Sequence, residues 1–312
     1  MIDRRAAPNL GPGLPDPAER AARKPGVSAG TSIATPPRVR SNLARVHDPS
    51  QDLHAIAAPA DPNGLAYDRN DDTLYIADGG GAVLAIEQGH RRRLATIDAA
   101  GCTANQLGGV AASPDGTVYV ARLGHGHAGA IFQISGSVVA ELPGLSPAAW
   151  RLGITYDPAE HALYATRYHK LAGVPCDGSI ERIDLSTGDV TSAVEGLCKP
   201  VGVVKLGSTL VISDSRRGTV LRADLVAGRT ERCRVLASGI DRPDSIAACS
   251  ADAVVLTTYR ADTGVGSVRK LWLDGTIGTV ASGRWEPRGI ASDGDRAFVS
   301  IRRGGRVLVF RI

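Results

Sequence analysis

The sequence is poor in aromatic residues and in methionine. Phe, Trp and Tyr make up 4% of its 312 residues, and it contains one Met. No stretch approaches the roughly 18 consecutive apolar residues that a membrane-spanning helix needs, so we expect none. The apolar share of 43% is still enough for a sizeable core, and with 37 Gly and 18 Pro it excludes a coiled coil, a collagen and a wholly disordered chain.

Acidic residues are scarce in the first 47 positions. This segment has eight basic and three acidic residues, a net charge of +5. Because the whole chain carries +4, the remainder is close to neutral, at −1. Seven prolines and no apolar periodicity accompany the charge, so we expect residues 1–48 to form a disordered or loosely attached tail and residues 49–312 to fold. No apolar segment follows Arg4-Arg5, so we expect a cytoplasmic protein with neither nucleic acid nor membrane as a partner.

A short motif recurs six times after residue 60. Each copy places a Gly or Ser just before an apolar strand, at positions 64, 109, 153, 202, 245 and 289. Alternating apolar residues and turns rich in Gly, Asp and Asn indicate four strands, A to D, in each unit. A period of 43 to 49 residues with only short strands inside it is the signature of propeller blades.

The sixth unit supplies an internal check because it is incomplete. It has strands A, B and C (289–291, 297–301 and 306–312), and then the chain ends. Residues 52–57, ahead of the first unit, match the D strands. We therefore predict an all-β fold, a six-bladed β-propeller of four-stranded antiparallel blades. Its ring is closed by this N-terminal strand D, which completes the last blade and pairs edges that would otherwise be exposed.

Two segments of the first unit carry a family resemblance. Residues 61–68 read Asp-Pro-Asn-Gly-Leu-Ala-Tyr-Asp, and residues 74–78 read Leu-Tyr-Ile-Ala-Asp. They resemble the repeats of NHL propellers and of the senescence-marker-protein/gluconolactonase family. The resemblance covers residues 52–312 at the level of the repeat. It implies the fold and leaves the activity open, because this propeller hosts lactonases, lyases, synthases and binding modules.

The gluconolactonase resemblance also implies a divalent metal, calcium or a transition metal, at the channel mouth. Family members hold it with Glu, two Asn and Asp at the starts of A strands. The six equivalent positions here are Asn63, Gly108, Leu152, Val201, Asp244 and Arg288. Asn63 and Asp244 match the pattern as metal ligands, and the Glu is missing. The alternative is that Arg288 takes the place of the cation and forms an ion pair with Asp244.

Long loops are predicted to gather on one face of the ring. In a propeller the B–C loops and D–A connections open on the same face, and here the B–C loops of blades 2, 3 and 5 are long. Their histidines and tyrosine supply candidate catalytic residues: His125, His127 and His169 as bases and Tyr259 as an acid. The candidate substrate-binding residues are Arg122, Arg167, Tyr168, Arg260, Arg288, Trp150 and Trp285.

The arginines on this face favour a small anionic ligand, although pairing with nearby carboxylates is the alternative. The three histidines could also bind a metal with an open coordination position. We therefore predict a small-molecule enzyme, a lactonase-type hydrolase or a lyase, acting on an anionic or carbonyl-bearing substrate. The arginines would stabilise the negative charge that develops. The alternative is a non-catalytic ligand-binding or protein-interaction propeller.

The five cysteines are odd in number and include no Cys-x-x-Cys motif. Cys233 and Cys249 fall in predicted strands, so we expect buried packing residues. Cys102, Cys176 and Cys198 fall in loops of the funnel side. Cys176 and Cys198 flank the last two strands of blade 3, which makes a disulfide geometrically possible. In a cytoplasmic chain free thiols are the stronger expectation.

Overall fold

A computed structural model describes residues 54–59, 61–98, 106–125, 127–169, 176–302 and 304–312. All of the regular structure in these ranges is β-strand. They contain no helix long and apolar enough to cross a membrane. The predicted tail, residues 1–48, and the first two residues of the predicted closing strand lie outside this part of the chain.

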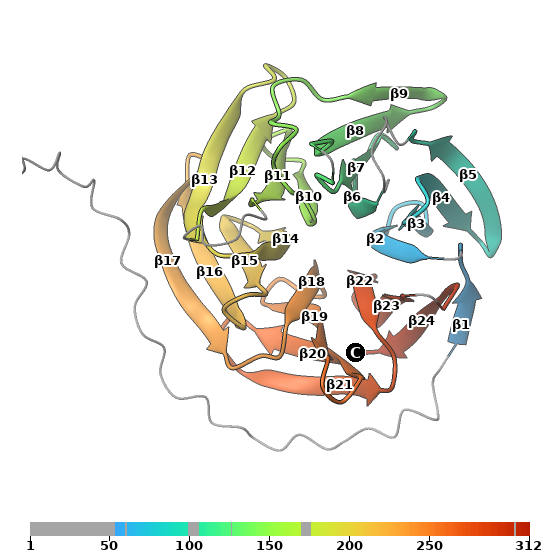
Figure 1. The fold of residues 1–312 in the computed structure, drawn as a ribbon, viewed down its shortest axis with the longest axis vertical. Helices are drawn as coiled ribbons and strands as arrows, with labels where there is room; N and C mark the ends of the chain where they lie inside the picture. Colours follow the sequence, from blue (N-terminus) through green and yellow to red (C-terminus); the bar gives the residue numbers. More distant parts are fainter. Residues whose placement is uncertain (1–53, 60, 99–105, 126, 170–175, 303) are drawn as a thin grey trace, which may run out of the picture. The chain divides into compact units, whose positions relative to one another are not determined.

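The strands form six antiparallel sheets of four strands each, arranged in a ring (Figure 1). Blade 1 contains β2 (Pro62–Asp68), β3 (Thr73–Asp78), β4 (Ala82–Glu87) and β5 (His90–Thr96). Blade 2 contains β6 (Leu107–Ala112), β7 (Val118–Arg122), β8 (Ala130–Ser135) and β9 (Val138–Glu141). Blade 3 contains β10 (Ile154–Asp157), β11 (Ala162–Arg167), β12 (Gly178–Asp184) and β13 (Val190–Leu197).

The second half of the ring repeats this order. Blade 4 contains β14 (Pro200–Leu206), β15 (Thr209–Asp214), β16 (Thr219–Val226) and β17 (Arg229–Ser238). Blade 5 contains β18 (Pro243–Ala248), β19 (Ala253–Arg260), β20 (Val265–Trp272) and β21 (Ile277–Gly283). Blade 6 contains β22 (Pro287–Ser292), β23 (Arg296–Ile301), β24 (Arg306–Arg311) and β1 (His54–Ala57). The predicted six-bladed propeller is confirmed.

Strand β1 closes the ring, as the sequence predicts. It pairs antiparallel with β24, so that His54 lies opposite Val309 and Ala57 opposite Arg306. Ile56 packs against the apolar cluster that includes Val307. The start and the end of the described chain therefore share one sheet, and the edge that β24 would expose is paired.

The apolar cores lie between neighbouring blades. In β3, Leu74 and Ile76 pack in a cluster with residues of blade 6, whereas Tyr75 and Ala77 pack in a cluster with residues of blade 2. This follows from the alternation of side chains between the two faces of a strand. The B strands are consequently buried along their length, while an outermost strand such as β9 is exposed throughout.

Glycines bring the A strands close together around the centre of the ring. A Cβ added to Gly109 would lie 2.7 Å from the carbonyl oxygen of Leu152, and one added to Gly202 would lie 2.7 Å from that of Asp244. Real Cβ atoms do not approach a backbone oxygen so closely, so these positions require glycine. The repeated Gly is therefore a packing requirement that sets the width of the central channel.

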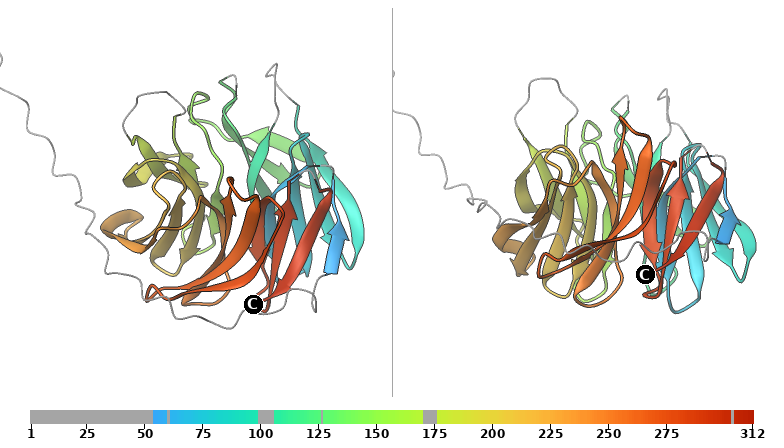
Figure 2. Two further views of the ribbon diagram at one scale, coloured as in Figure 1. Left: turned by 60° about the horizontal axis from the view of Figure 1, so that its bottom comes forward. Right: turned by 90° about the horizontal axis from the view of Figure 1, so that it is seen from below.

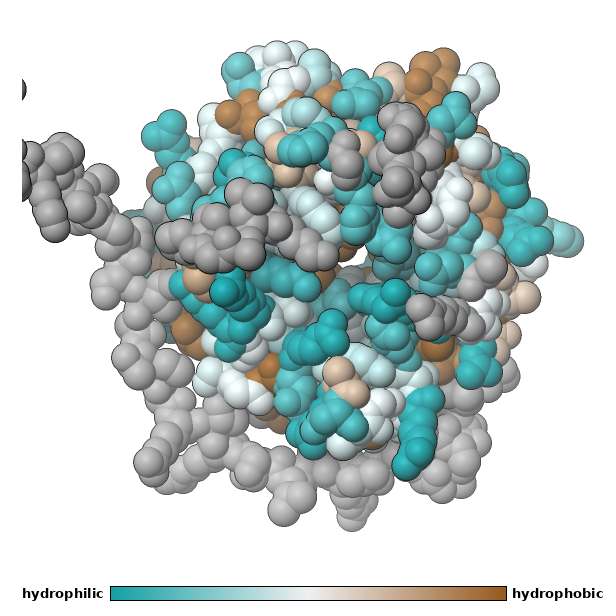
Figure 3. Space-filling model, viewed as in Figure 1, coloured by the Kyte–Doolittle hydropathy of each residue, from teal (hydrophilic) through white to brown (hydrophobic). Residues whose placement is uncertain are grey.

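The two faces of the ring are formed by different connections. We call the face of the B–C loops and D–A connections the funnel face, and the face of the A–B and C–D turns the turn face. The strands run between these two faces (Figure 2). Figure 3 looks onto the funnel face, which is hollowed at the centre and surrounded there by hydrophilic side chains.

Candidate functional site

A channel lined by the A strands of all six blades occupies the centre of the ring. Its cavity of about 440 Å³ extends from Asn63, Asp244 and Arg288 on the funnel face to Tyr67 and Tyr156 near the turn face. A smaller cavity of about 100 Å³ shares Asn63, Asp244 and Arg288 with it. These three residues therefore stand at the mouth of the channel, where a ligand entering from the funnel face would meet them.

The mouth is lined mostly by charged and polar side chains, which we call the mouth residues. They are Asp61, Asn63, Gln106, Lys199, Ser215, Arg242, Asp244, Arg288 and Arg302. Four of these side chains are cationic and two are anionic, so the described lining favours an anion. Leu123, Leu152 and Val201 complete it with apolar surface.

A chain of ion pairs runs across the mouth from blade 5 to blade 6. Arg288 Nη1 lies 3.7 Å from Asp244 Oδ2, and Arg288 Nη2 donates to Glu286 Oε1 at 2.8 Å. Arg302 Nη1 donates to the same Glu286 oxygen at 3.0 Å. The alternative interpretation of Arg288, as an ion-pair partner of Asp244 in the channel, is thus confirmed. Glu286 holds both guanidinium groups in place.

Asp244 is in an unusual electrostatic position. Burial raises the pKa of its carboxyl above the ordinary value, although Arg288, Lys199 and Arg242 act in the opposite direction. Within the described residues no hydrogen bond reaches this carboxylate, and 26% of the side chain is still exposed toward the channel. A desolvated carboxyl with a raised pKa in a cavity is a candidate acid or base.

Buried hydroxyl groups of the B strands fix the backbone at the mouth. Each donates to a carbonyl oxygen at the start of the next blade's A strand: Ser213 to Asp244, Thr257 to Arg288 at 2.9 Å, and Ser300 to Asn63 at 2.7 Å. These bonds hold the backbone of Asn63, Asp244 and Arg288 in place relative to the neighbouring blade. Sequence reasoning missed them, although a Ser or Thr near the end of the B strands in blades 3 to 6 was a readable signal.

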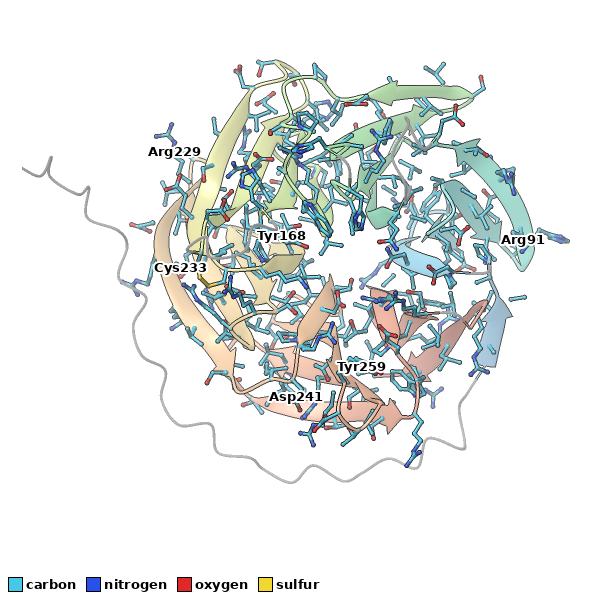
Figure 4. All side chains as sticks on the ribbon, viewed as in Figure 1. Arg91, Tyr168, Arg229, Cys233, Asp241 and Tyr259 are labelled. Atoms are coloured by element: carbon cyan, nitrogen blue, oxygen red, sulfur yellow. A yellow bond between two sulfur atoms is a disulfide. The ribbon has the colours of Figure 1, made fainter. Side chains whose placement is uncertain are left out.

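Arg242 reaches the mouth through a strained backbone. Its φ is +38°, in the left-handed region, and Pro243 follows it. A residue before proline is biased toward extended conformations, so this geometry persists only because the surroundings impose it. The guanidinium carbon lies 5.8 Å from the ring centre of Tyr259. Tyr259, predicted as an acid, therefore supports a mouth residue in this structure, and Figure 4 labels it in blade 5.

The three candidate histidines have separate surroundings. His125 packs edge-on against Trp150 with ring centroids 4.3 Å apart, and His127 is exposed with a φ of +59°. His169 Nδ1 lies 2.6 Å from Asp177 Oδ2. The described residues, which include all three histidines, contain no group of three His, Cys, Asp or Glu that could hold a metal ion. Their role as bases stays a prediction, since none belongs to the described lining of the mouth.

The family-type metal site does not fit the mouth either. Asn63 Nδ2 donates to the Leu107 carbonyl oxygen at 2.5 Å, and Asp244 faces the guanidinium of Arg288. The A strands between them present Gly108, Leu152 and Val201, which offer no side-chain oxygen. Calcium needs six to eight oxygen ligands, so these six positions do not supply the ligand set of the family's calcium site.

Arg122 is built into the fold. It is 4% exposed, its Nε donates to the Ala128 carbonyl oxygen at 2.6 Å, and its Nη1 donates to that of Asp98 at 3.2 Å. Its guanidinium carbon also lies 4.8 Å from the ring centre of Phe132. These contacts tie the B–C loop of blade 2 to its sheet, so the structure gives Arg122 a role in holding the loop.

Two further candidate arginines have carboxylate partners. Arg167 Nε lies 3.4 Å from Glu181, which also pairs with the fully buried Arg151 at 2.8 Å. Arg260 Nη2 lies 2.7 Å from Asp241, and both side chains are about half exposed. Pairing with nearby carboxylates, the alternative interpretation, therefore accounts for these two arginines.

The candidate aromatic residues divide into two groups. Trp285 packs against Phe310, with ring centroids 5.9 Å apart, in the apolar cluster of blades 5 and 6. Trp150 and Tyr168 form an isolated β-bridge on the funnel face, and their ring centroids are 6.0 Å apart. The second pair therefore places aromatic surface on the funnel face.

Cys176 and Cys198 form a disulfide, so the expectation of free thiols is wrong. Their Cα atoms are brought together because both lie at the funnel-face ends of blade 3. The Cys198 and Lys199 amides donate to the buried Asp214 carboxylate at 2.8 and 3.0 Å. The bond therefore links Cys176, just before β12, to the segment that carries the mouth residue Lys199.

The other cysteines agree with the sequence where the structure describes them. Cys233 and Cys249 are free and buried, as predicted, and burial raises the pKa of both thiols. Raised pKa values make them poor nucleophiles. Cys102 lies outside the described residues.

Comparison with known proteins finds similar folds only. No protein-family model matches the chain, and no curated protein matches its sequence. A gluconolactonase from Xanthomonas campestris is similar with a TM-score of 0.66 at 16% identity, covering 92% of this chain and 98% of that one. Regucalcin, a calcium-binding protein from Agrobacterium tumefaciens, gives 0.62 at 17%, covering 81% and 90%. Virginiamycin B lyase from Staphylococcus aureus gives 0.58 at 16%, covering 84% and 99%.

These similarities define the class of fold. The chain is a six-bladed propeller similar to those of gluconolactonase and regucalcin, which confirms the resemblance to the gluconolactonase-like propellers at the level of the fold. The matched structures include a lactonase and a lyase, so enzymes with different chemistry use this architecture. At these identities the reaction has to be inferred from the side chains of this chain.

Proposed function

We propose that the protein is a small-molecule enzyme that binds an anionic, carbonyl-bearing substrate at the channel mouth and hydrolyses it as a lactone. The supporting observation is Asp244, a carboxyl with a raised pKa that shares one cavity with Lys199, Arg242 and Arg288. A base needs a pKa near the working pH, and an anion needs positive partners. The mouth brings the two requirements together.

The arginines of the mouth supply the anion site. Glu286 fixes Arg288 and Arg302 through one carboxylate oxygen, at 2.8 and 3.0 Å. Each guanidinium has five N–H donors, so both keep donors for a ligand carboxylate. Fixed donors bind an anion with less loss of side-chain freedom than mobile ones. The substrate would therefore be held by charge-assisted hydrogen bonds beside Asp244.

In the proposed reaction Asp244 accepts a proton from water, and the water oxygen forms a bond to the lactone carbonyl carbon. Arg288 stabilises the negative charge that develops on the carbonyl oxygen. The ring C–O bond then breaks and the proton passes from Asp244 to the leaving oxygen. Lactone and water thus give a hydroxy acid. In an elimination the same base would instead remove a proton from carbon as the leaving group departs, and product analysis separates the two reactions.

The test compares Asp244→Asn with Asp241→Asn on a panel of lactones that carry a carboxylate group, with the neutral glucono-δ-lactone and γ-butyrolactone for comparison. Asp241 is a matched control because it lies three residues away and pairs with Arg260 in solvent. We expect Asp244→Asn to lower kcat by roughly 10²–10⁴-fold, the usual contribution of a general base. Asp241→Asn should stay within about twofold, since exposed ion pairs contribute little.

The pH profile gives a second readout of the same proposal. A base acts when it is deprotonated, and the pKa of Asp244 is raised. The kcat of the wild type should therefore rise with pH and level off above a midpoint higher than the ordinary value of about 4. Wild-type protein that binds carboxylates but turns over neither lactones nor elimination substrates would overturn the proposal and favour a ligand-binding propeller.

A further inference from the structure

Tyr168 is a buried tyrosine whose hydroxyl has no hydrogen-bond partner among the described residues. The residue is 4% exposed. Among the described residues, the side-chain N and O atoms that are fully buried and lack a hydrogen-bond partner are Thr219 Oγ1 and Arg269 Nε. The Tyr168 hydroxyl oxygen does not belong to this group of fully buried atoms. The small exposed surface of Tyr168 therefore includes the hydroxyl. By contrast, the buried Tyr164 hydroxyl donates to Glu160 at 2.9 Å. A buried polar group without a partner calls for a ligand or water.

The backbone holds Tyr168 firmly in this position. Its amide donates to the Trp150 carbonyl oxygen at 3.1 Å, and the Trp150 amide donates to the Tyr168 carbonyl oxygen at 2.8 Å. The two rings pack with their centroids 6.0 Å apart. Figure 4 labels Tyr168 on the inner side of the ring, between blades 3 and 4. Trp150 lies two residues before Leu152, which lines the mouth, so this backbone pairing holds Tyr168 rigidly beside the mouth.

The surroundings keep the hydroxyl protonated. Burial raises the pKa of Tyr168, and the negative charge of Asp244 raises it further. Tyr168 is therefore a hydrogen-bond donor at any pH near neutrality, and a neutral donor suits a neutral acceptor such as a carbonyl oxygen.

We propose that Tyr168 donates a hydrogen bond to a carbonyl or lactone oxygen of the ligand, next to the anionic group held by the mouth arginines. The role of Tyr168 rests on the proposed function for one point, the position of the ligand at the mouth. Together, the hydrogen bond from Tyr168 and the contacts with the mouth arginines define the substrate class: carboxylates with a second acceptor oxygen on the carbon next to the carboxylate group. A site built to donate to an oxygen discriminates against an analogue that lacks it.

The test uses pyruvate and methacrylate as probes, because methacrylate replaces the pyruvate C=O by C=CH₂ and keeps the shape and the charge. Binding is measured by NMR titration of the full chain. We expect the wild type to bind pyruvate about tenfold more tightly, the effect of one hydrogen bond. Tyr168→Phe should lose this preference while still binding methacrylate with unchanged affinity.

Tyr119→Phe is the matched control. Tyr119 is 3% exposed, has a pKa raised to about 12 by burial, and stacks on Tyr156 toward the turn face. It should keep the preference for pyruvate. A near-ultraviolet difference spectrum on adding pyruvate gives a second readout, expected in the wild type and in Tyr119→Phe. Because this spectrum is recorded on the wild type and on Tyr119→Phe, it can be interpreted even if the Tyr168→Phe variant does not fold.

The outcomes separate this inference from the proposed function. An unchanged preference in Tyr168→Phe, or a wild type without preference or difference spectrum, overturns the role of Tyr168 and leaves the mouth as the anion site. Binding of neither probe, with lactone turnover that still depends on Asp244, overturns the substrate class alone. Binding of neither probe without turnover overturns both proposals.

Discussion

Asp244 at the channel mouth and two aspartates of the turn face differ in their hydrogen bonds and in their pKa values. On the turn face the Asp115 carboxylate accepts from the Ser113 hydroxyl and from the Thr117 amide at 3.0 Å, and these bonds lower its pKa. Asp274 accepts from the Thr276 amide at 2.8 Å with the same effect. On the funnel face Asp244 has no such bond among the described residues, and its pKa is raised. Hydrogen-bonded carboxylates shape turns, whereas a carboxylate without such bonds is available for chemistry.

The connections differ in the same way. Turns such as the one that contains Asp115 are short, and side-chain-to-backbone bonds are enough to fix them. On the funnel face, two connections are joined by the Cys176–Cys198 disulfide, and B-strand hydroxyls hold the starts of the A strands. The funnel face therefore depends on tertiary links for the position of its side chains. Three experiments test this contrast.

The largest effect is expected from the disulfide. Replacing both cysteines, Cys176→Ser with Cys198→Ser, removes a link between residues 22 positions apart. A closed loop of this size contributes about 3 kcal/mol to the free energy of unfolding. Urea denaturation of the double variant measures the loss. Reductant should destabilise the wild type by a similar amount and leave the double variant unchanged.

Peptide mapping without reductant checks the link directly. Free thiols at both positions in protein isolated under alkylating conditions would contradict the bond. Because cytosolic reductants keep most thiols reduced, the same map also tests the expected cytoplasmic location.

The next effect concerns the charge at the mouth. Arg288→Met removes the guanidinium that lies 3.7 Å from Asp244. Since a charged hydrogen bond contributes about 1.5–3 kcal/mol, we expect pyruvate to bind roughly 10–100-fold more weakly. Arg288 also opposes the rise in the Asp244 pKa, so the pH at half-maximal kcat should move upward.

The control for this change is an arginine of the turn face. Arg296 pairs with Asp293 at 2.6 Å, and Arg296→Met should leave both the affinity for pyruvate and the pH midpoint as they are. Equal losses in the two variants would show that the effect is one of overall charge, and the distinction between the faces would fail.

The fold was predictable because its determinants are local. The Gly carried by five of the six A strands, as at Gly109 and Gly202, is dictated by the close approach of the next blade, so it recurs in the sequence. Strand alternation is likewise visible in any short window. Even the closure by β1 could be read, because the missing strand of the last blade had a matching segment elsewhere.

The site was only partly predictable because it depends on distances between blades. Sequence placed Asp244 and Arg288 at the mouth and offered their ion pair as an alternative, which the structure confirms. It could not tell that Arg122 would be buried by its own loop, since that depends on Phe132 and two backbone oxygens. The sequence indicated that Cys176 and Cys198 could lie close together, but the expected cytoplasmic location favoured free thiols.

The smallest effect is the sharpest test of the contrast, because its sign differs between Asp115 and Asp244. The lowered pKa of Asp115 means that its charge stabilises the fold above the pKa of the unfolded chain, and that this contribution is lost as the pH falls through the folded pKa. Asp115→Asn should therefore lower the stability at pH 7 by roughly 0.5–1 kcal/mol and have little effect once the pH is below the folded pKa. For Asp244 the raised pKa reverses the sign: the fold is favoured while the carboxyl is protonated, and stability falls as the pH rises through the folded pKa. Asp244→Asn should therefore raise the thermal midpoint at pH 7 and leave it unchanged at low pH, in the same protein that has lost its turnover. Such a gain is expected where a side chain is kept for chemistry at a cost to stability. A loss of stability in both variants at pH 7 would mean that Asp244 serves the fold as Asp115 does.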